Sequence, residues 1–385
     1  MKVLIYTQDY FPPAGGVQKI VMELARGLAG WQRQHPAAEP FEVTVVTNTP
    51  AGTYRDNSEP FDLVRCPSFW TLARLLRTAD VVHLAGPALL PMALALLLRK
   101  PVVVEHHGFH VACPNGLLFY EPTQTPCPGH FMAERYEKCV QCNSNVVGAR
   151  KSWQWLLMTP VRRWLAGRCT INVTPTDWLA TVLKLKDART VYHGVSVNGD
   201  TVRTPTTPAV FAFQGRLVTT KGVGVLLRAA NNLRDANREF RLRIIGDGPE
   251  EAALKSQAAG LDGQVQFLGP VSDERLADAL EDVSAVVMPS LGGEVFGLVA
   301  AENMLRGKLP IVSDIGALRE VVSDAGLVFK TGDAGALAAC MRKVIENPSL
   351  SASLSQKTRK RASELFGLDT MIQRHVSLYR EALHR

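Results

Sequence analysis

Short runs of apolar residues alternate with longer amphipathic segments along almost the whole chain. The short runs end in glycine, proline or polar residues, as buried parallel strands do, and the longer segments repeat their apolar positions at helical spacing. This alternation predicts α/β domains with parallel sheets. We predict strands at residues 3–6, 43–47, 63–65, 81–84, 102–105 and 171–174, and in the second half at 210–214, 242–245, 265–268, 285–288, 310–313 and 326–329.

One polar segment, 198–208, separates the two sets of strands. It is rich in threonine and carries two prolines, which is typical of a linker. We therefore predict an N-terminal Rossmann-like domain over 1–197 and a C-terminal one over 209–366, followed by a terminal helix over 367–385. Because ligands of open parallel sheets bind beyond the carboxyl ends of the strands, both domains are expected to face one shared cleft.

The composition is that of an ordinary globular protein, with 46% apolar and 21% charged residues in 385. The longest apolar run, 88–98, is shorter than the roughly 18 residues needed to span a bilayer, so we interpret it as a buried helix. The chain opens on a strand pattern without the organisation of a cleavable signal. These features favour a cytoplasmic enzyme.

Residues 292–302, Gly-Gly-Glu-Val-Phe-Gly-Leu-Val-Ala-Ala-Glu, are the most informative stretch of the chain. A strand end precedes them, and a helix is predicted to begin near Gly297. The unpaired N–H groups and the dipole of such a helix end bind phosphate. Glu302 in the helix is suited to ribose hydroxyls, and Glu294 in the loop to the hydroxyls of a sugar. The alternative is a solvated helix with two surface glutamates.

A second strand-to-helix turn carries two cations, Arg216 and Lys221, after Gly215. When a sugar leaves a nucleotide diphosphate, the charge on the diphosphate grows in the transition state. Fixed cations stabilise that charge more than they stabilise the bound substrate. We interpret Arg216 and Lys221 as groups that bind the diphosphate. The alternative is ordinary surface charge.

Taken in order, the motifs resemble those of the retaining glycosyltransferases of family 4, which have the two-Rossmann-domain architecture called GT-B. The resemblance spans nearly the whole chain. It includes Gly15-Gly16-Val17-Gln18 after the first strand, His107-Gly108 after the fifth, Gly215-Arg216-Leu217 with Lys221-Gly222, and Glu294-Val295-Phe296-Gly297 with Glu302. The run from Glu302 to Gly307 departs from the family in being bulkier than its usual alanine-rich helix.

The resemblance assigns a role to each of these positions. It implies that Arg216 and Lys221 bind the donor diphosphate, Glu302 the ribose and Glu294 the donor sugar. It further implies sugar transfer with retained configuration, no catalytic metal, and a terminal helix that crosses back onto the first domain. The remaining implied contacts are backbone N–H groups near Phe296, Gly297 and Leu298, close approach of the diphosphate at Gly15 and Gly16, and His107 beside the reacting sugar.

Four of the seven cysteines cluster in a segment, 112–143, that is rich in proline and glycine. They are Cys113, Cys127, Cys139 and Cys142. Four thiolates close a tetrahedral zinc site, and a cytosolic chain seldom forms disulfides. We hypothesise a structural zinc knuckle here, with four thiols that bind no metal as the alternative.

Cations and tryptophans alternate in the segment 150–168. It contains Trp153, Trp155, Arg162, Arg163 and Trp164, and no acidic residue occurs from 138 to 176. Such a pattern suits an anionic membrane interface, and Thr159-Pro160 is expected to begin a second short helix. The alternative is a core helix with a solvated basic edge. The net charge of +7 comes without a nucleic-acid-binding motif, so we expect no nucleic acid partner.

These features together predict a glycosyltransferase that takes a UDP- or GDP-sugar as donor. The basic segment suggests a lipid-linked glycan acceptor, met at the inner face of the cytoplasmic membrane during cell-surface polysaccharide or lipopolysaccharide synthesis. Two alternatives stay open. A GT-B epimerase would keep the donor pocket without needing an acceptor, and a catalytically silent assembly partner would keep only the fold.

Overall fold

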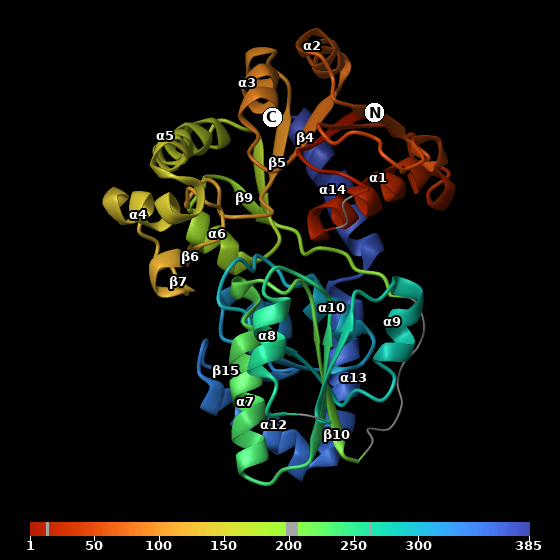
Figure 1. Cartoon of the computed structure of the whole chain (residues 1–385). Coiled ribbons are helices and arrows are strands. Elements are labelled where there is room, and N and C mark those ends of the chain that lie inside the picture. The colour runs from red at the N-terminus through yellow and green to blue at the C-terminus, as the bar shows by residue number, and fades with distance from the viewer. Residues whose placement is uncertain (13–14, 198–206, 262) are drawn as a thin grey trace. The chain divides into compact units, whose positions relative to one another are not determined.

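The computed structural model describes residues 1–12, 15–197, 207–261 and 263–385 (Figure 1). They form two compact units. The first comprises Met1–Leu117, Gly129–Gly194 and Leu368–Arg385, and the second comprises Leu118–Pro128 and Val195–Gly367. The chain therefore passes between units near residue 194, just before the predicted linker, most of which lies outside the described residues. It returns to the first unit at Leu368, where the terminal helix begins.

A parallel sheet with strand order β3-β2-β1-β4-β5-β8-β9 forms the centre of the first unit. Its strands are β1 (Lys2–Thr7), β2 (Glu42–Thr47), β3 (Asp62–Arg65), β4 (Val81–Ala85), β5 (Val102–Glu105), β8 (Ile171–Thr174) and β9 (Ala188–Thr190). The six predicted strands are confirmed. The seventh, β9, was missed because its three residues are only half-buried and form no apolar run.

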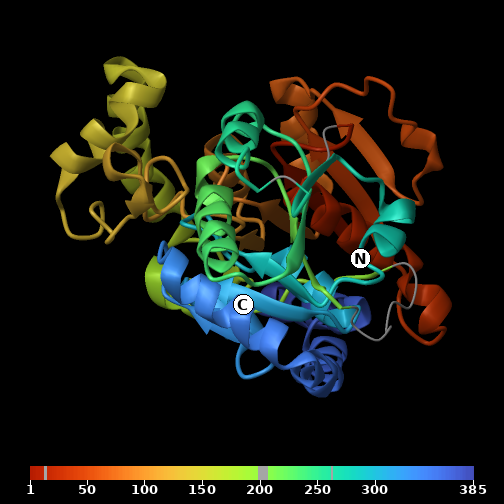
Figure 2. The ribbon, with the colours of Figure 1, turned by 60° about the horizontal axis from the view of Figure 1, so that its bottom comes forward.

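Helices pack in two groups around this sheet. Helix α1 packs against α14, while α3 packs against both α2 and α5 (Figure 1). The helices of this unit are α1 (Gly16–Gln34), α2 (Phe69–Thr78), α3 (Leu89–Leu97), α4 (Tyr136–Val147), α5 (Ala149–Ala166), α6 (Asp177–Leu183) and α14 (Leu368–Leu383). Figures 1 and 2 both show α4 and α5, in yellow, side by side.

The second unit repeats the same architecture with the order β12-β11-β10-β13-β14-β15, again all parallel. Its strands are β10 (Ala209–Gln214), β11 (Phe240–Ile245), β12 (Val265–Gly269), β13 (Ala285–Met288), β14 (Leu309–Ser313) and β15 (Leu327–Phe329). Its helices are α7 (Val223–Asp235), α8 (Glu251–Gln257), α9 (Asp273–Ala279), α10 (Leu298–Leu305), α11 (Gly316–Val322), α12 (Ala334–Glu346) and α13 (Pro348–Leu365).

Two expectations about the first domain are wrong in detail. The segment 112–143 does not belong to one domain, because the hairpin of β6 (Phe119–Tyr120) and β7 (Thr125–Pro126) groups with the second unit. The side chain of Phe119 is fully buried there and lies against Gly292. The apolar run at 88–98 does form a helix, but α3 is buried on one side only, since Met92 and Ala95 are buried while Leu90 and Leu97 are largely exposed. Within the described part of the chain, no helix has the length and apolar character to cross a bilayer.

Candidate functional site

The predicted donor residues gather at the carboxyl ends of β10 and β13 in the second unit. These strands are neighbours, and the order of the sheet reverses between them. Open parallel sheets bind ligands at such a reversal, because the loops after the two strands diverge to opposite faces and leave a crevice. One loop carries Arg216 and Lys221, and the other carries Glu294 and leads into α10 after Gly297.

Lys221 and Glu294 form a half-buried ion pair at this crevice. The Nζ atom of Lys221 lies 2.5 Å from Oε1 of Glu294, and Ser290 donates its hydroxyl to the same oxygen at 2.8 Å. The hydroxyl of Ser313 in turn donates to the carbonyl of Ser290 at 2.8 Å. Sequence reasoning missed Ser290, although its position four residues before Glu294 was a signal. These bonds orient the carboxylate, and Oε2 accepts none of the hydrogen bonds found among the described residues.

The loop after β10 is fixed by backbone hydrogen bonds to its neighbours. The N–H of Gly215 bonds to Ile245 at 3.0 Å and that of Leu217 to Asp247 at 2.7 Å. The N–H of Leu291 bonds to Thr220 at 2.7 Å, which joins the two loops of the crevice. Arg216 is exposed at this turn. Both cations therefore stand on a rigid backbone, as binding of a diphosphate requires.

Helix α10 starts directly after Gly297, and its buried residues include Glu302. The amide of Asn303 donates to the side-chain oxygen of Gln214 at 3.1 Å and so attaches this helix to the end of β10. Arg306, one turn beyond Glu302, is also buried, and burial lowers the pKa of its guanidinium against the opposing effect of Glu302. The bulkier end of this helix thus adds a buried cation that sequence reasoning did not assign. Phe296 does not face solvent but packs edge-on against Phe366 at 5.3 Å.

His107 follows β5 in the first unit, at the carboxyl edge of that sheet. Its Nε2 atom lies 3.6 Å from Oε2 of Glu105, and its ring stacks on His193 with centroids 5.1 Å apart. Burial lowers the pKa of His107, and the Glu105 carboxylate opposes that shift. Nε2 of His106 lies 2.9 Å from Oδ1 of Asn172, so this buried ring has a structural partner.

The glycine pair after β1 lies at the start of α1. Gly15 is the N-cap and Gly16 the first helical residue, so both stand at the amino end of a long helix near the carboxyl edge of the first sheet. A Cβ atom on Gly15 would lie 2.5 Å from Oε1 of Gln18. The N–H groups at the amino end of a helix favour an anion, in agreement with the predicted approach of the diphosphate at Gly15 and Gly16.

The predicted cysteine site is divided between the two units. Cys127 falls in the second unit and the other three cysteines in the first. Cys139 and Cys142 stand one turn apart on α4 and are buried. Asn115 lies between two thiols, with Oδ1 at 3.0 Å from Sγ of Cys113 and Nδ2 at 3.7 Å from Sγ of Cys142. The zinc knuckle stays a prediction.

The tryptophan-rich segment forms the single helix α5, with Pro160 inside it, so the expected second short helix is wrong. The hydroxyl of Thr159 bonds to the carbonyl of Trp155 at 2.8 Å instead of capping a new helix. Trp153, Leu157, Val161 and Trp164 recur at helical spacing and are each about half exposed or more. Arg163 was predicted to face an anionic membrane. Its guanidinium instead donates to the carbonyls of Leu183 and Lys184 at the end of α6.

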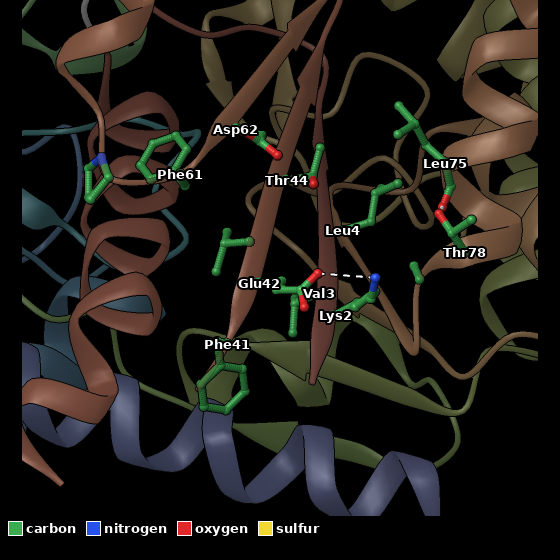
Figure 3. A pocket seen from close by; sticks show the side chains of 13 residues that line it. Lys2, Val3, Leu4, Phe41, Glu42, Thr44, Phe61, Asp62, Leu75 and Thr78 are labelled. Carbon is green, nitrogen blue, oxygen red and sulfur yellow. Dashed lines mark hydrogen bonds and ion pairs between the residues drawn. The ribbon is translucent and has the colours of Figure 1, made fainter. Parts of the chain in front are cut away.

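Two hollows lie away from these sites, at the amino ends of strands. Figure 3 shows one of about 310 Å³ beside β1, β2 and β3, where Nζ of Lys2 lies 3.1 Å from Oε2 of Glu42. Another, of about 210 Å³, lies at the amino end of β10. Ligands of parallel sheets bind at the opposite edge, so we assign neither hollow a role.

Two family models together match nearly the whole chain. Residues 14–198 match Glycosyltransferase Family 4, and residues 200–361 match Glycosyl transferases group 1. The chain is 31% identical over 202 residues to a phosphatidyl-myo-inositol mannosyltransferase of Mycobacterium leprae, covering 50% of this chain and 54% of that protein. The chain thus spans about half the length of this curated relative. It is 25% identical over 403 residues to O-antigen chain mannosyltransferase C of Escherichia coli, covering 98% of both.

A solved structure shares the fold over its whole length. HepE of Anabaena in complex with UDP superposes with a TM-score of 0.72 at 17% identity, covering 99% of this chain and 100% of that one. At 17% sequence identity, this similarity establishes the shared fold and nothing further.

Proposed function

Since the chain belongs to the family 4 glycosyltransferases and has their GT-B fold, we propose that it transfers a sugar from a nucleotide diphosphate sugar to a glycan acceptor with retained anomeric configuration. The observation that supports this most is the convergence of Lys221, Glu294 and the start of α10 at the carboxyl ends of the neighbouring strands β10 and β13. The related structure that holds UDP and the relative named for O-antigen synthesis both support this reaction class.

Different residues of this site bind different parts of the donor. Arg216, Lys221 and the amino end of α10 stabilise the departing diphosphate, which gains charge as the glycosidic bond breaks. Glu302 accepts from ribose hydroxyls, and Glu294 accepts from donor-sugar hydroxyls through Oε2. His107 donates a hydrogen bond to the reacting sugar, the role that the family resemblance assigns to it. None of these roles requires a catalytic metal.

A panel of UDP- and GDP-sugars tests the reaction. We expect one donor to release nucleotide diphosphate and to pass its sugar to a lipid extract, and we expect Glu294→Ala to lose at least about 10²-fold in transfer. The matched control is Glu250→Ala, since the Glu250 carboxylate accepts a hydrogen bond from the hydroxyl of Thr219, two residues before Lys221. Release of an epimerised free nucleotide sugar would favour the epimerase. Failure to bind any nucleotide diphosphate would favour the silent assembly partner.

For the acceptor, we propose a lipid-linked glycan reached by docking the first unit on an anionic bilayer. The stripe of Trp153, Leu157, Val161 and Trp164 along α5 is apolar and exposed. Arg150 and Lys151 are exposed at the start of the same helix, and the Arg168 guanidinium lies 3.6 Å over the Trp164 ring at its end. An apolar stripe with flanking cations inserts into the headgroup region of anionic lipid. This location corresponds to the inner face of the cytoplasmic membrane.

Vesicle binding tests this surface. The triple variant in which Trp153, Leu157 and Trp164 are each changed to serine is expected to bind anionic vesicles at least about tenfold more weakly, because the apolar anchor is lost. Arg150→Gln with Lys151→Gln should cost about fivefold for each charge and only on anionic vesicles. Arg163→Gln is the control, since this cation is held by carbonyls of α6. Unchanged vesicle binding by the triple variant would contradict the proposal.

A further inference from the structure

A buried carboxylate in the first unit is surrounded by imidazoles from four separate segments. Glu105 ends β5, and its Oε2 atom lies 3.2 Å from Nε2 of His83 on β4 and 3.5 Å from Nε2 of His375 on α14. Nε2 of His107 is 3.6 Å from the same oxygen, and Nδ1 of His193 is 3.4 Å from Oε1. The side chains of Glu105, His83 and His375 are at most 1% exposed.

The other ring nitrogens of two imidazoles are already held by the protein. Nδ1 of His375 lies 2.9 Å from the carbonyl oxygen of Met371, which only accepts, so Nδ1 carries a hydrogen and Nε2 is the nitrogen that lies nearest to Glu105. Nδ1 of His83 lies 3.0 Å from the hydroxyl of Tyr379. A partner on the outer nitrogen that fixes the ring and its tautomer is the usual support of a metal-binding histidine.

The inner atoms meet without hydrogen bonds. Nε2 of His83 and of His375 and both oxygens of Glu105 are buried and have no hydrogen-bond partner in the part of the chain that the structure describes. A buried polar group left unbonded costs about 1–3 kcal/mol, and here two imidazole nitrogens and both carboxylate oxygens are left so. A cation bound between these atoms removes that penalty.

The spacing of the three atoms matches that of metal ligands. A tetrahedral zinc ion with bonds of about 2.0–2.1 Å holds its ligand atoms about 3.3 Å apart. The distances from Oε2 of Glu105 to the two histidines, 3.2 and 3.5 Å, bracket that value. Among the residues that the structure describes, His83, Glu105 and His375 form one of two groups of His, Cys, Asp or Glu side chains whose ligand atoms all lie within 4.8 Å of one another. Two histidines and one glutamate, with water in the fourth position, are a common zinc set.

We propose that His83, Glu105 and His375 bind a divalent transition metal, with zinc as the expected occupant. The site joins β4, β5 and the terminal helix α14, which pack together in the first unit (Figure 1). It therefore clamps the last segment of the chain to the sheet. Because Glu105 also contacts His107, the metal fixes the strand end from which that histidine projects. The site is distinct from the four cysteines and from the donor-binding residues of the second unit.

Metal analysis of the full chain, purified without a histidine tag, tests the site. To remove the contribution of a cysteine site, the background is Cys139→Ser with Cys142→Ser. We expect about one zinc ion per chain in this background, less than about 0.2 after adding His375→Gln, and no change after adding His384→Gln, an exposed histidine just beyond α14. Equal metal content in the His375 and His384 variants, or a background chain that takes up no zinc, would overturn the proposal.

Cobalt provides a readout that does not depend on folding of the histidine variant. The background chain is stripped with a chelator and refilled with Co²⁺. We expect the visible d–d absorption of a four-coordinate site with nitrogen and oxygen ligands, without the near-ultraviolet charge-transfer band that thiolate ligands give. We also expect Zn²⁺ to raise the melting temperature of the stripped chain. A cobalt spectrum equal to that of Co²⁺ in buffer, or one dominated by the thiolate band, would overturn the assignment.

Discussion

Replacing Lys221 with alanine is expected to lower kcat by about 10²–10³-fold, with a smaller change in KM for the donor. The Nζ atom is within 2.5 Å of Glu294 Oε1 and one third of the side chain is exposed, so the cation both fixes the carboxylate and reaches into the crevice. Charge on the diphosphate grows in the transition state, which makes the loss larger in kcat than in binding. Single-turnover transfer with the donor found in the panel measures it.

Two comparisons separate these effects. Lys357→Ala is the control, since Lys357 also forms an ion pair in the second unit, at 2.6 Å from Asp324, but on exposed surface. We expect it to leave kcat unchanged. The double variant Lys221→Ala, Glu294→Ala should lose less than the product of the two single losses, because the groups act as a unit. A Lys221→Ala enzyme with wild-type kcat would contradict the assignment of this cation to the leaving group.

The sheets and the donor crevice were predictable because their signals are local. Each predicted strand is a short apolar run closed by turn residues, and twelve such runs were found where the structure has strands. Once the runs are ordered, the rule that ligands bind at the carboxyl ends of parallel strands places Arg216, Lys221 and Glu294 together. That β10 and β13 are neighbours comes from the order of the sheet, which the strand runs alone do not give.

The buried histidine cluster was not predictable, because its members are far apart in the chain. His83, Glu105 and His375 lie in three separate segments, and only the return of α14 to the first unit brings them together. The prediction at Pro160 failed because it used only a local rule. Proline often begins a helix, but here α5 packs against α3 and α4 and continues through Pro160. The role of Arg163 likewise depends on a carbonyl twenty residues away.

Gly222→Ala is expected to be among the most destabilising single changes in the second unit, by at least about 3 kcal/mol. Gly222 follows Lys221 directly and adopts φ of +68°, and a Cβ atom there would lie 2.0 Å from the carbonyl oxygen of Pro289. That oxygen belongs to the backbone of the loop that carries Glu294, so relief of the clash must separate the two loops of the crevice. We therefore expect nucleotide diphosphate binding to be lost at temperatures where the chain is still folded.

Gly269→Ala is the matched control, because Gly269 has the same φ of +68° with no atom within 4 Å of the added Cβ. This variant carries only the cost of the left-handed backbone, about 1–2 kcal/mol, so the difference between the two variants isolates the steric clash. Denaturant unfolding gives the two stabilities, and calorimetric titration with UDP and GDP gives the binding. Equal stabilities would mean that the loop of Pro289 yields easily, and retained nucleotide affinity in Gly222→Ala would mean that the crevice does not depend on contact between its loops.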